Sequence, residues 1–371
     1  MSGLAGRPAK SLVVGIDLGD RSSTYTVRSR DAQEILLRGS VATEATGILS
    51  EFQQFQPQTF ILETGTHARW MGQLLEAMGH EVVVANARKL KLISENNTKS
   101  DKVDPDLLSS LGCMNPEWLH PVYQRSQAAH NDLTMVKARE VMVKTRTEMI
   151  NFVRGTVKAF GCRIRKCDSE HFLDVAKEEV PKAMQPALSG MLELLAELNE
   201  RIYEYDCHIE HLGQGRYQEQ TRWVMQVNGV GPITALTFVL TIEDPGRFES
   251  SRDVGPYLGL IPSKRQSGKR DPQMGISKAG DELLRKLLVN CAHHILGYRG
   301  EDSDLRRWGL KLVEDGLKAG MQAARSRAAT AVARKLAVLV HALWVKKEKY
   351  EPLRNSQAAK PAAAGEAAKA A

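Results

Sequence analysis

The chain has 371 residues, a formal net charge of +7 and a pI of about 9.1, and 42% of its residues are hydrophobic. This length predicts two or three domains, and the basic balance suits a polyanionic partner, because phosphate contacts dominate nucleic-acid affinity. Five cysteines without a CxxC pair argue against a disulfide framework and a structural zinc site. No apolar stretch approaches the length that spans a membrane, and the flexible N-terminus, residues 1–11, lacks a signal-peptide core, so we expect a cytoplasmic protein.

Residues 12–125 alternate strand and helix patterns. Segments 11–19, 22–30 and 34–42 each read as a strand and follow one another closely, as in an antiparallel meander. Strand–helix–strand crossovers then continue to about residue 112, and this order predicts an RNase H-like α/β fold. In such a fold the first segment is the central strand and ends at Asp17, and the strand that ends at Glu63 is its parallel neighbour, so the carboxyl ends of both strands lie at one edge of the sheet.

Four acidic residues stand out in this domain: Asp17, Glu63, Asp101 and Asp104. The first two end apolar runs that read as buried strands, and the last two have the i, i+3 spacing that shares one helical face. Singly, each is more often a turn residue or part of a solvated face. As an ordered set they would repel one another unless a divalent cation lay between them, and Mg²⁺ (or Mn²⁺) prefers such oxygen ligands. The set predicts a metal site suited to phosphoryl chemistry.

Residues 126–215 change to long helical patterns, interrupted near Pro181 and Pro186, and predict an antiparallel, coiled-coil-like arm. The first helix carries a basic face that includes Lys144 and Arg146. Two interpretations stay open: a linker or dimerisation arm whose charges are solvated, and a surface that follows a nucleic-acid backbone.

Residues 216–350 predict a helical domain. It opens with a segment typical of a helix-hairpin-helix, in which Gly229 and Gly231 precede Pro232 at a helix start. Such a turn presents backbone N–H groups to a phosphate. The alternative is an ordinary turn between two helices.

A serine-bearing basic loop follows. Ser267 lies among four cations, which are Lys264, Arg265, Lys269 and Arg270. Cations could activate the hydroxyl as a nucleophile, whereas composition alone favours a basic loop that only touches DNA. Further along, Ser277 reads as a helix N-cap, and Lys278 and Arg285 add two more candidate nucleic-acid contacts. The Ala/Lys-rich tail, residues 351–371, predicts disorder.

These motifs occur in one order over residues 12–300: the acidic tetrad, a helical arm, the NGVGPITA segment, GLIPSKRQSGK and ISKAGDELLR. The combination closely resembles the DEDD-type serine transposases, which are insertion-sequence recombinases with an N-terminal domain like the Holliday-junction resolvase RuvC. The resemblance implies an α/β plus all-α architecture. It comprises a RuvC-like domain (12–125), a helical arm (126–215) and a C-terminal transposase domain (216–350).

The resemblance also implies function. The acids Asp17, Glu63, Asp101 and Asp104 would hold Mg²⁺, and Ser267 would attack a DNA phosphate and form a phosphoserine intermediate. Family members bind a noncoding guide RNA from their own element, which pairs with donor and target DNA. They act as homo-oligomers, dimer or tetramer, with a composite site from two subunits. We therefore expect an RNA-guided DNA recombinase that works at the nucleoid and needs no membrane.

Two alternatives remain. One is a metal-dependent nuclease or junction resolvase, in which the tetrad activates water and Ser267 only contacts phosphate. The other is a catalytically idle, nucleic-acid-binding relic of a transposase.

Overall fold

The computed structural model describes residues 4, 6–90, 103–263 and 274–358, and these divide into two compact units, residues 1–125 and 126–371. The boundary falls where the sequence predicts the arm to begin. The other predicted boundary, between residues 215 and 216, lies within the second unit.

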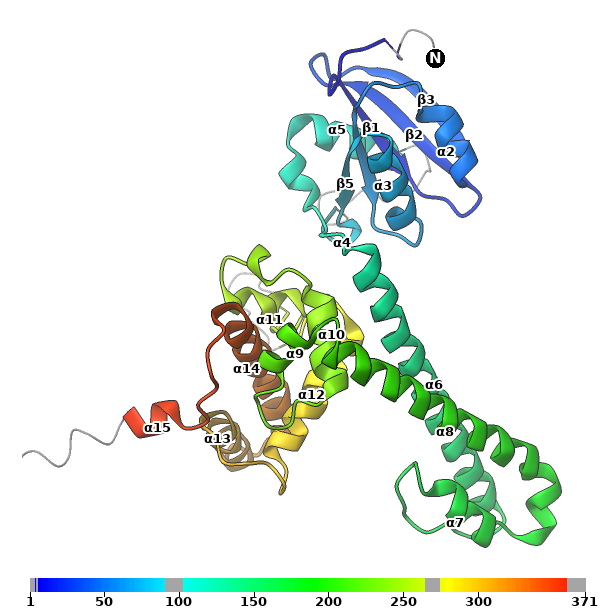
Figure 1. Ribbon diagram of the computed structural model, residues 1–371, viewed down its shortest axis with the longest axis vertical. Helices are drawn as coiled ribbons and strands as arrows, with labels where there is room; N and C mark the ends of the chain where they lie inside the picture. The colour runs from blue at the N-terminus through cyan, green and yellow to red at the C-terminus, as the bar shows by residue number, and fades with distance from the viewer. Residues whose placement is uncertain (1–3, 5, 91–102, 264–273, 359–371) are drawn as a thin grey trace, which may run out of the picture. The chain divides into compact units, whose positions relative to one another are not determined.

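The first unit is built on a five-stranded sheet of order β3-β2-β1-β4-β5 (Figure 1). Its strands are β1 (Leu12–Asp17), β2 (Ser22–Ser29), β3 (Ile35–Ala42), β4 (Thr59–Glu63) and β5 (Glu81–Ala85). Strands β1, β2 and β3 form an antiparallel meander, while β4 pairs parallel with both β1 and β5. The predicted meander, crossovers and central strand are confirmed, and the arrangement is consistent with an RNase H-like fold.

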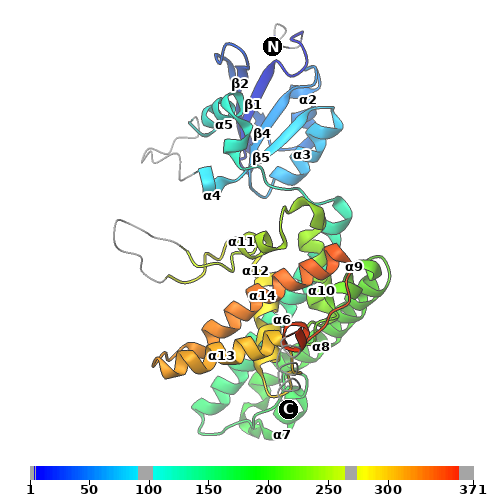
Figure 2. The ribbon, with the colours of Figure 1, turned by 90° about the vertical axis from the view of Figure 1, so that its left-hand side faces the viewer.

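Helices cover both faces of this sheet (Figure 2). On one face, α2 (Ala45–Phe52) and α3 (Ala68–Ala77) bury alternate residues of β1 such as Val14 and Ile16. On the other face, α5 (Val103–Met114) packs on Val13 of β1 and Ile61 of β4, beside the short helix α4 (Ala87–Leu90). Strands β1 and β4 are apolar on both faces because both faces are covered.

The second unit begins with a helical hairpin. Helices α6 (Gln127–Ala159) and α8 (Gln185–Gln214) lie side by side, and α7 (Phe172–Glu179) packs at their far end (Figure 1). The hairpin has its own core around Val153, Phe172 and Leu195. The predicted arm is therefore an antiparallel hairpin. The segment that connects its two helices contains α7, so it is longer than the interruption near Pro181 and Pro186 that the sequence predicts.

The rest of the second unit is a helical domain. It contains α9 (Gln218–Val224), α10 (Pro232–Ile242), α11 (Val254–Tyr257), α12 (Glu282–Leu296), α13 (Asp304–Lys318) and α14 (Ala324–Lys346). Its core joins α10, α12 and α14, and every residue of α10 from position 234 to position 242 is buried. A helix that is apolar all round belongs inside a protein.

Two expectations were wrong. The first was that no apolar stretch approaches the length that spans a membrane. Helix α14 is long and apolar enough by length and composition, but 56% of that stretch is buried within the domain, which is typical of a core helix. Order also extends past residue 350, because α15 covers Arg354–Ala358 and the Asp304 backbone N–H donates to the Pro352 carbonyl at 2.7 Å. Contacts with α13 therefore order the first part of the predicted tail.

Candidate active site

Asp17 and Glu63 lie next to each other at one edge of the sheet. Each is the last residue of its strand, and the neighbouring residues Ile16 and Leu62 are partners in the parallel register of β1 and β4. Adjacent strands are about 4.8 Å apart, and residues in register present their side chains on the same face. Both residues are half-buried and have interactions with the surrounding protein. The predicted pairing of these two acids at the carboxyl ends of the strands is confirmed at the level of the backbone.

Helix α5 approaches this edge through a glycine contact. A Cβ atom added to Gly15 would lie 2.3 Å from the carbonyl oxygen of Pro105 and 2.7 Å from the backbone nitrogen of Ser109. Gly15 precedes Asp17 by two residues, so both point to the face that α5 covers. Asp104 is the residue immediately before Pro105 in α5. The backbone of Asp104 is thus brought beside the strand that carries Asp17.

Asp106 fastens the same end of α5 to the neighbouring strands. Its carboxylate accepts a hydrogen bond from the Thr26 hydroxyl at 2.6 Å and from the Arg38 guanidinium at 3.1 and 2.7 Å. The hydrogen bonds from Arg38, and then from Thr26, hold the pKa of Asp106 below its usual range despite partial burial. Sequence reasoning missed this residue and Gly15. The available signals were an acid two positions after Asp104 and a glycine inside a buried strand.

The tetrad as a whole extends past the described residues. Asp101 lies outside them, and for Asp104 only the backbone is described. Within the part of the chain that the structure describes, no three His, Cys, Asp or Glu residues form a group suited to a metal ion. The donor set itself fits a hard divalent cation, because carboxylates at the ends of adjacent parallel strands supply the oxygen ligands that Mg²⁺ and Mn²⁺ prefer.

The second predicted site is the serine loop. Ser267 and its four neighbouring cations, Lys264, Arg265, Lys269 and Arg270, all lie outside the described residues. The base of the loop is described: Pro262 and Ile276 form an antiparallel bridge, and the Ser263 backbone N–H donates to the Gly275 carbonyl at 2.9 Å. The Ser263 hydroxyl also donates to that carbonyl, at 2.9 Å. Ser263 therefore closes the base of the loop.

Arg285 holds the chain that leads out of this loop. Its guanidinium donates to the carbonyls of Ala279 at 2.6 Å, Gly280 at 3.1 Å and Leu258 at 3.2 Å. These bonds assign Arg285 to anchoring the backbone beside the loop; the loop itself lies outside the described residues, and the predicted contact of Arg285 with nucleic acid stays a prediction. The expectation of an N-cap at Ser277 was wrong, because α12 begins at Glu282 and Asp281 caps it by accepting from the Leu284 N–H at 2.9 Å.

The exposed Lys278 has a positive φ of 54° and lies in the turn between Ser277 and this cap. It forms no ion pair with a residue that the structure describes. The position is compatible with the predicted contact to nucleic acid.

The predicted turn between α9 and α10 is present. Gly229 has a φ of +91°, and a Cβ there would lie 3.0 Å from the His294 ring, so glycine is needed both for backbone conformation and for packing. Gly231 caps α10 and Pro232 starts it, and both are exposed. The exposed helix N-terminus is the feature that a phosphate contact requires.

Two cations on the basic face of α6 join the two hairpin helices. Arg146 is half-buried and donates to the Asn199 side chain at 3.2 Å, and Arg139 pairs with Asp206 at 2.6 Å. Lys144 remains exposed, with Glu148 at 3.9 Å one turn away. This geometry favours a structural role for Arg146 and leaves Lys144 accessible.

Two family profiles match the chain. The profile of the transposase IS116/IS110/IS902 family matches residues 221–305, which include the turn at Gly229 and both ends of the serine loop. The profile of the DEDD transposases of the IS110 type matches residues 14–161, from β1 to the end of α6. The chain belongs to the IS110/IS116/IS902 family of transposases. For this IS110-family transposase, DNA is the class of substrate, and the DEDD domain implies a divalent metal requirement.

Curated relatives agree. The transposase for insertion sequence element IS1111A of Coxiella burnetii is 29% identical over 58% of this chain and 59% of its own length. The putative transposase y4pF/y4sB of Sinorhizobium fredii is 26% identical over 78% and 75%. The transposase for IS1328 of Yersinia enterocolitica is 25% identical over 76% and 82%. The similarity thus spans 59–82% of the length of these relatives.

Proposed function

We propose that this IS110-family transposase is an RNA-guided recombinase, which cuts and rejoins DNA through Ser267 with the help of a metal-binding tetrad. The observation that carries the proposal is the close approach of α5 to β1 at Gly15. It brings the backbone of Asp104 to the edge of the sheet where the pairing of β1 with β4 holds Asp17 and Glu63 side by side. Ligands in open α/β sheets bind at such carboxyl ends.

Asp17, Glu63, Asp101 and Asp104 would hold Mg²⁺ or Mn²⁺. A bound divalent ion would supply positive charge beside the scissile phosphate and stabilise the charge that develops there. The protein's own contribution is to hold the carboxylates in place. Gly15 allows α5 to reach the strand, and Asp106 ties the helix to Thr26 and Arg38.

The serine step is a phosphoryl transfer. The Ser267 oxygen forms a bond to phosphorus, the bond from phosphorus to the 3′ oxygen breaks, and the 3′ oxygen gains the proton that the serine loses. The 5′ phosphate is then joined to serine, and attack by the 3′ hydroxyl of another strand reverses the step. Because the number of phosphate ester bonds is conserved, exchange needs no nucleotide cofactor. Ser263 is a poorer candidate, since its hydroxyl is bonded within the base of the loop.

Guidance and assembly rest on the resemblance to DEDD-type serine transposases. A noncoding RNA from the element would supply sequence specificity by base pairing, as in other guided systems. The protein would then hold backbones, for which the exposed N-terminus of α10 and the side chains Lys144 and Lys278 are candidates. A homo-oligomer would bring the tetrad of one subunit to the serine of another.

The test is a search for a covalent protein–DNA adduct on a denaturing gel. Purified protein, the noncoding RNA that flanks its gene, Mg²⁺ and labelled junction DNA are incubated together. Ser267→Ala and Asp17→Ala are compared with the wild type, and Ser263→Ala is the matched control. We expect a shifted band with the wild type and with Ser263→Ala, and none with the other two variants.

Free cleaved DNA that persists in Ser267→Ala without an adduct would contradict the serine mechanism and indicate a metal-dependent nuclease. An adduct that forms equally well without the RNA would contradict guidance. Loss of the adduct in Ser263→Ala alone would move the nucleophile to that residue.

A further inference from the structure

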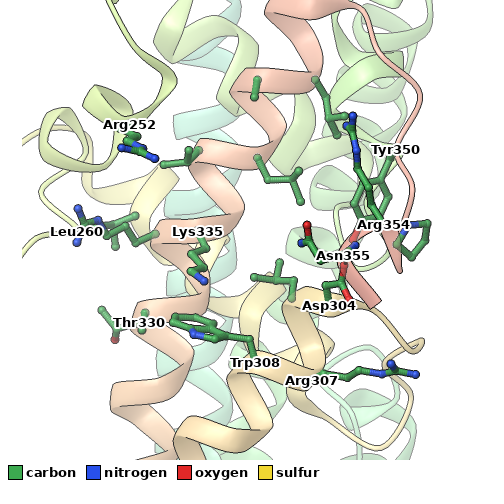
Figure 3. A pocket seen from close by; sticks show the side chains of 18 of the residues that line it. Arg252, Leu260, Asp304, Arg307, Trp308, Thr330, Lys335, Tyr350, Arg354 and Asn355 are labelled. Atoms are coloured by element: carbon green, nitrogen blue, oxygen red, sulfur yellow. Dashed lines mark hydrogen bonds between the residues drawn. The ribbon is translucent and has the colours of Figure 1, made fainter. Parts of the chain in front are cut away.

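The second unit contains a large groove that the proposed chemistry does not use. It has a volume of about 1410 Å³, which exceeds the roughly 300–1,000 Å³ of small-molecule pockets. Helix α14 forms its floor (Figure 3). One wall is the segment from Arg252 to Pro262 with residues 274–276, and the other is α13 with residues 349–356.

The floor and walls are largely apolar. Leu260, Val338, Leu339 and Tyr350 line the groove, together with Trp308 on α13. The ammonium group of Lys335 lies 3.6 Å from the centroid of the Trp308 ring, and Figure 3 shows the two side chains next to each other. A base that stacks on this face of Trp308 would displace the ammonium group from the ring.

The groove is also strongly cationic. Seven of its lining residues are Arg or Lys, against two acids, Asp304 and Glu351. Hydrogen bonds from Ser356 and Asn355 hold the pKa of Asp304 below its usual range, so this acid is already bonded within the protein. Among the described residues Arg252, Arg334 and Lys349 take part in no ion pair, whereas Arg307 pairs with Asp302. The surplus positive charge calls for an anionic occupant.

We propose that this groove binds a single strand of DNA, with unpaired bases against the apolar floor and phosphates against the cations. Duplex DNA hides its base faces, so an apolar and aromatic floor contributes only when the bases are unpaired. The lining residues of α14 run from Ser326 to Leu343, which at 1.5 Å per residue is about 26 Å. At roughly 3.4 Å per stacked nucleotide this length accepts at most about seven nucleotides.

DNA is the occupant that the family indicates, and the proposal rests on the proposed function because a strand must separate from its complement before it can be joined to another strand. The groove wall includes Pro262 and Ile276, which form the base of the serine loop. A strand in the groove would therefore run toward the segment that carries the nucleophile. The chain's own tail fits less well, since residues 359–371 contain two lysines and one glutamate.

The test is fluorescence anisotropy with a labelled 15-nucleotide DNA of mixed sequence, in EDTA and without RNA. The double variant Arg334→Gln, Lys335→Gln is compared with Arg325→Gln, Lys346→Gln, which removes two exposed cations of the same helix that do not line the groove. Each lost phosphate contact lowers the salt slope by about 0.7 for a single strand. We expect the groove variant to bind about 25-fold more weakly at 0.1 M salt, with a slope smaller by about 1.4, and the control to match the wild type.

Trp308→Leu separates stacking from charge. It should weaken binding at least about fivefold with an unchanged salt slope, and Trp308→Phe should recover most of the loss. Equal binding by the groove and control variants would overturn the proposal. So would equal competition by a 15-base-pair duplex, tenfold tighter binding of the same RNA sequence, or a changed oligomeric state of the groove variant with unchanged DNA binding.

This design distinguishes a failure of the proposed DNA binding in the groove from a failure of the proposed serine chemistry. Asp17→Ala should bind the oligonucleotide as the wild type does, because Asp17 is not among the residues that line the groove. If no adduct forms with any protein while the groove variant still binds weakly, the proposed chemistry is wrong and the groove assignment stands.

Discussion

Gly15→Ala should disable the transposase although it adds only one methyl group. The new Cβ would lie 2.3 Å from the Pro105 oxygen and 2.7 Å from the Ser109 nitrogen, and both are backbone atoms that no rotamer change can move. Ordinary contacts between non-bonded heavy atoms lie near 3.5 Å. Helix α5 must therefore retreat from β1 by about 1 Å. Overpacking of this kind costs about 1–3 kcal/mol.

The loss of activity should exceed the loss of stability. Displacing Asp104 by about 1 Å from Asp17 and Glu63 would spoil the geometry of the proposed metal ligands, and misplacement on that scale costs about 100-fold in rate. The assay is metal-dependent DNA cleavage, together with hydrogen–deuterium exchange of the peptide that covers α5. We expect faster exchange in α5 and cleavage lowered about 100-fold.

Gly72→Ala is the matched control in the same unit. A Cβ at Gly72 would meet Val82 at 3.5 Å and Leu62 at 3.7 Å, which are ordinary contacts. Since Gly72 lies within α3, alanine there should stabilise the helix by about 0.5–1 kcal/mol and leave cleavage unchanged. Wild-type cleavage and exchange in Gly15→Ala would refute the reasoning, as would equal damage in both variants.

Three further predictions follow from the described contacts. Asp106→Asn should lower the free energy of unfolding by about 1–2 kcal/mol, because the acceptor of the hydrogen bond from the Arg38 guanidinium loses its charge. It should also raise the Mg²⁺ concentration needed for half-maximal cleavage. An unchanged Mg²⁺ titration would contradict the anchoring role of Asp106. Burial lowers the pKa of His341, so the unfolded chain takes up the proton first as pH falls below about 6.5. Melting at pH 5.5 should therefore occur at a lower temperature than at pH 7.5, and by a smaller margin in His341→Gln. Ser263→Ala should keep the adduct but lose the hydroxyl bond to Gly275, which proteolysis of the serine loop would detect as faster nicking.

Local sequence patterns determined most of the architecture of this chain. Apolar runs ending in Asp17 and Glu63 predict two buried strands, and the spacing of the crossovers predicts that those strands are parallel neighbours. The long amphipathic stretches likewise predict a helical hairpin. These features follow from hydrophobic periodicity and turn chemistry, which act over a few residues and can be read without knowing what lies opposite.

Contacts between distant segments were decided only by the tertiary structure. The need for glycine at position 15 depends on Pro105, ninety residues away, and Asp106 reads as a solvated acid until Thr26 and Arg38 are placed beside it. Arg146 looks like a surface charge in the sequence but bonds to Asn199 across the hairpin. The groove over α14 is formed by segments that are far apart in the chain. Packing of this kind depends on the register and distance between elements, which a pattern along a single segment does not contain.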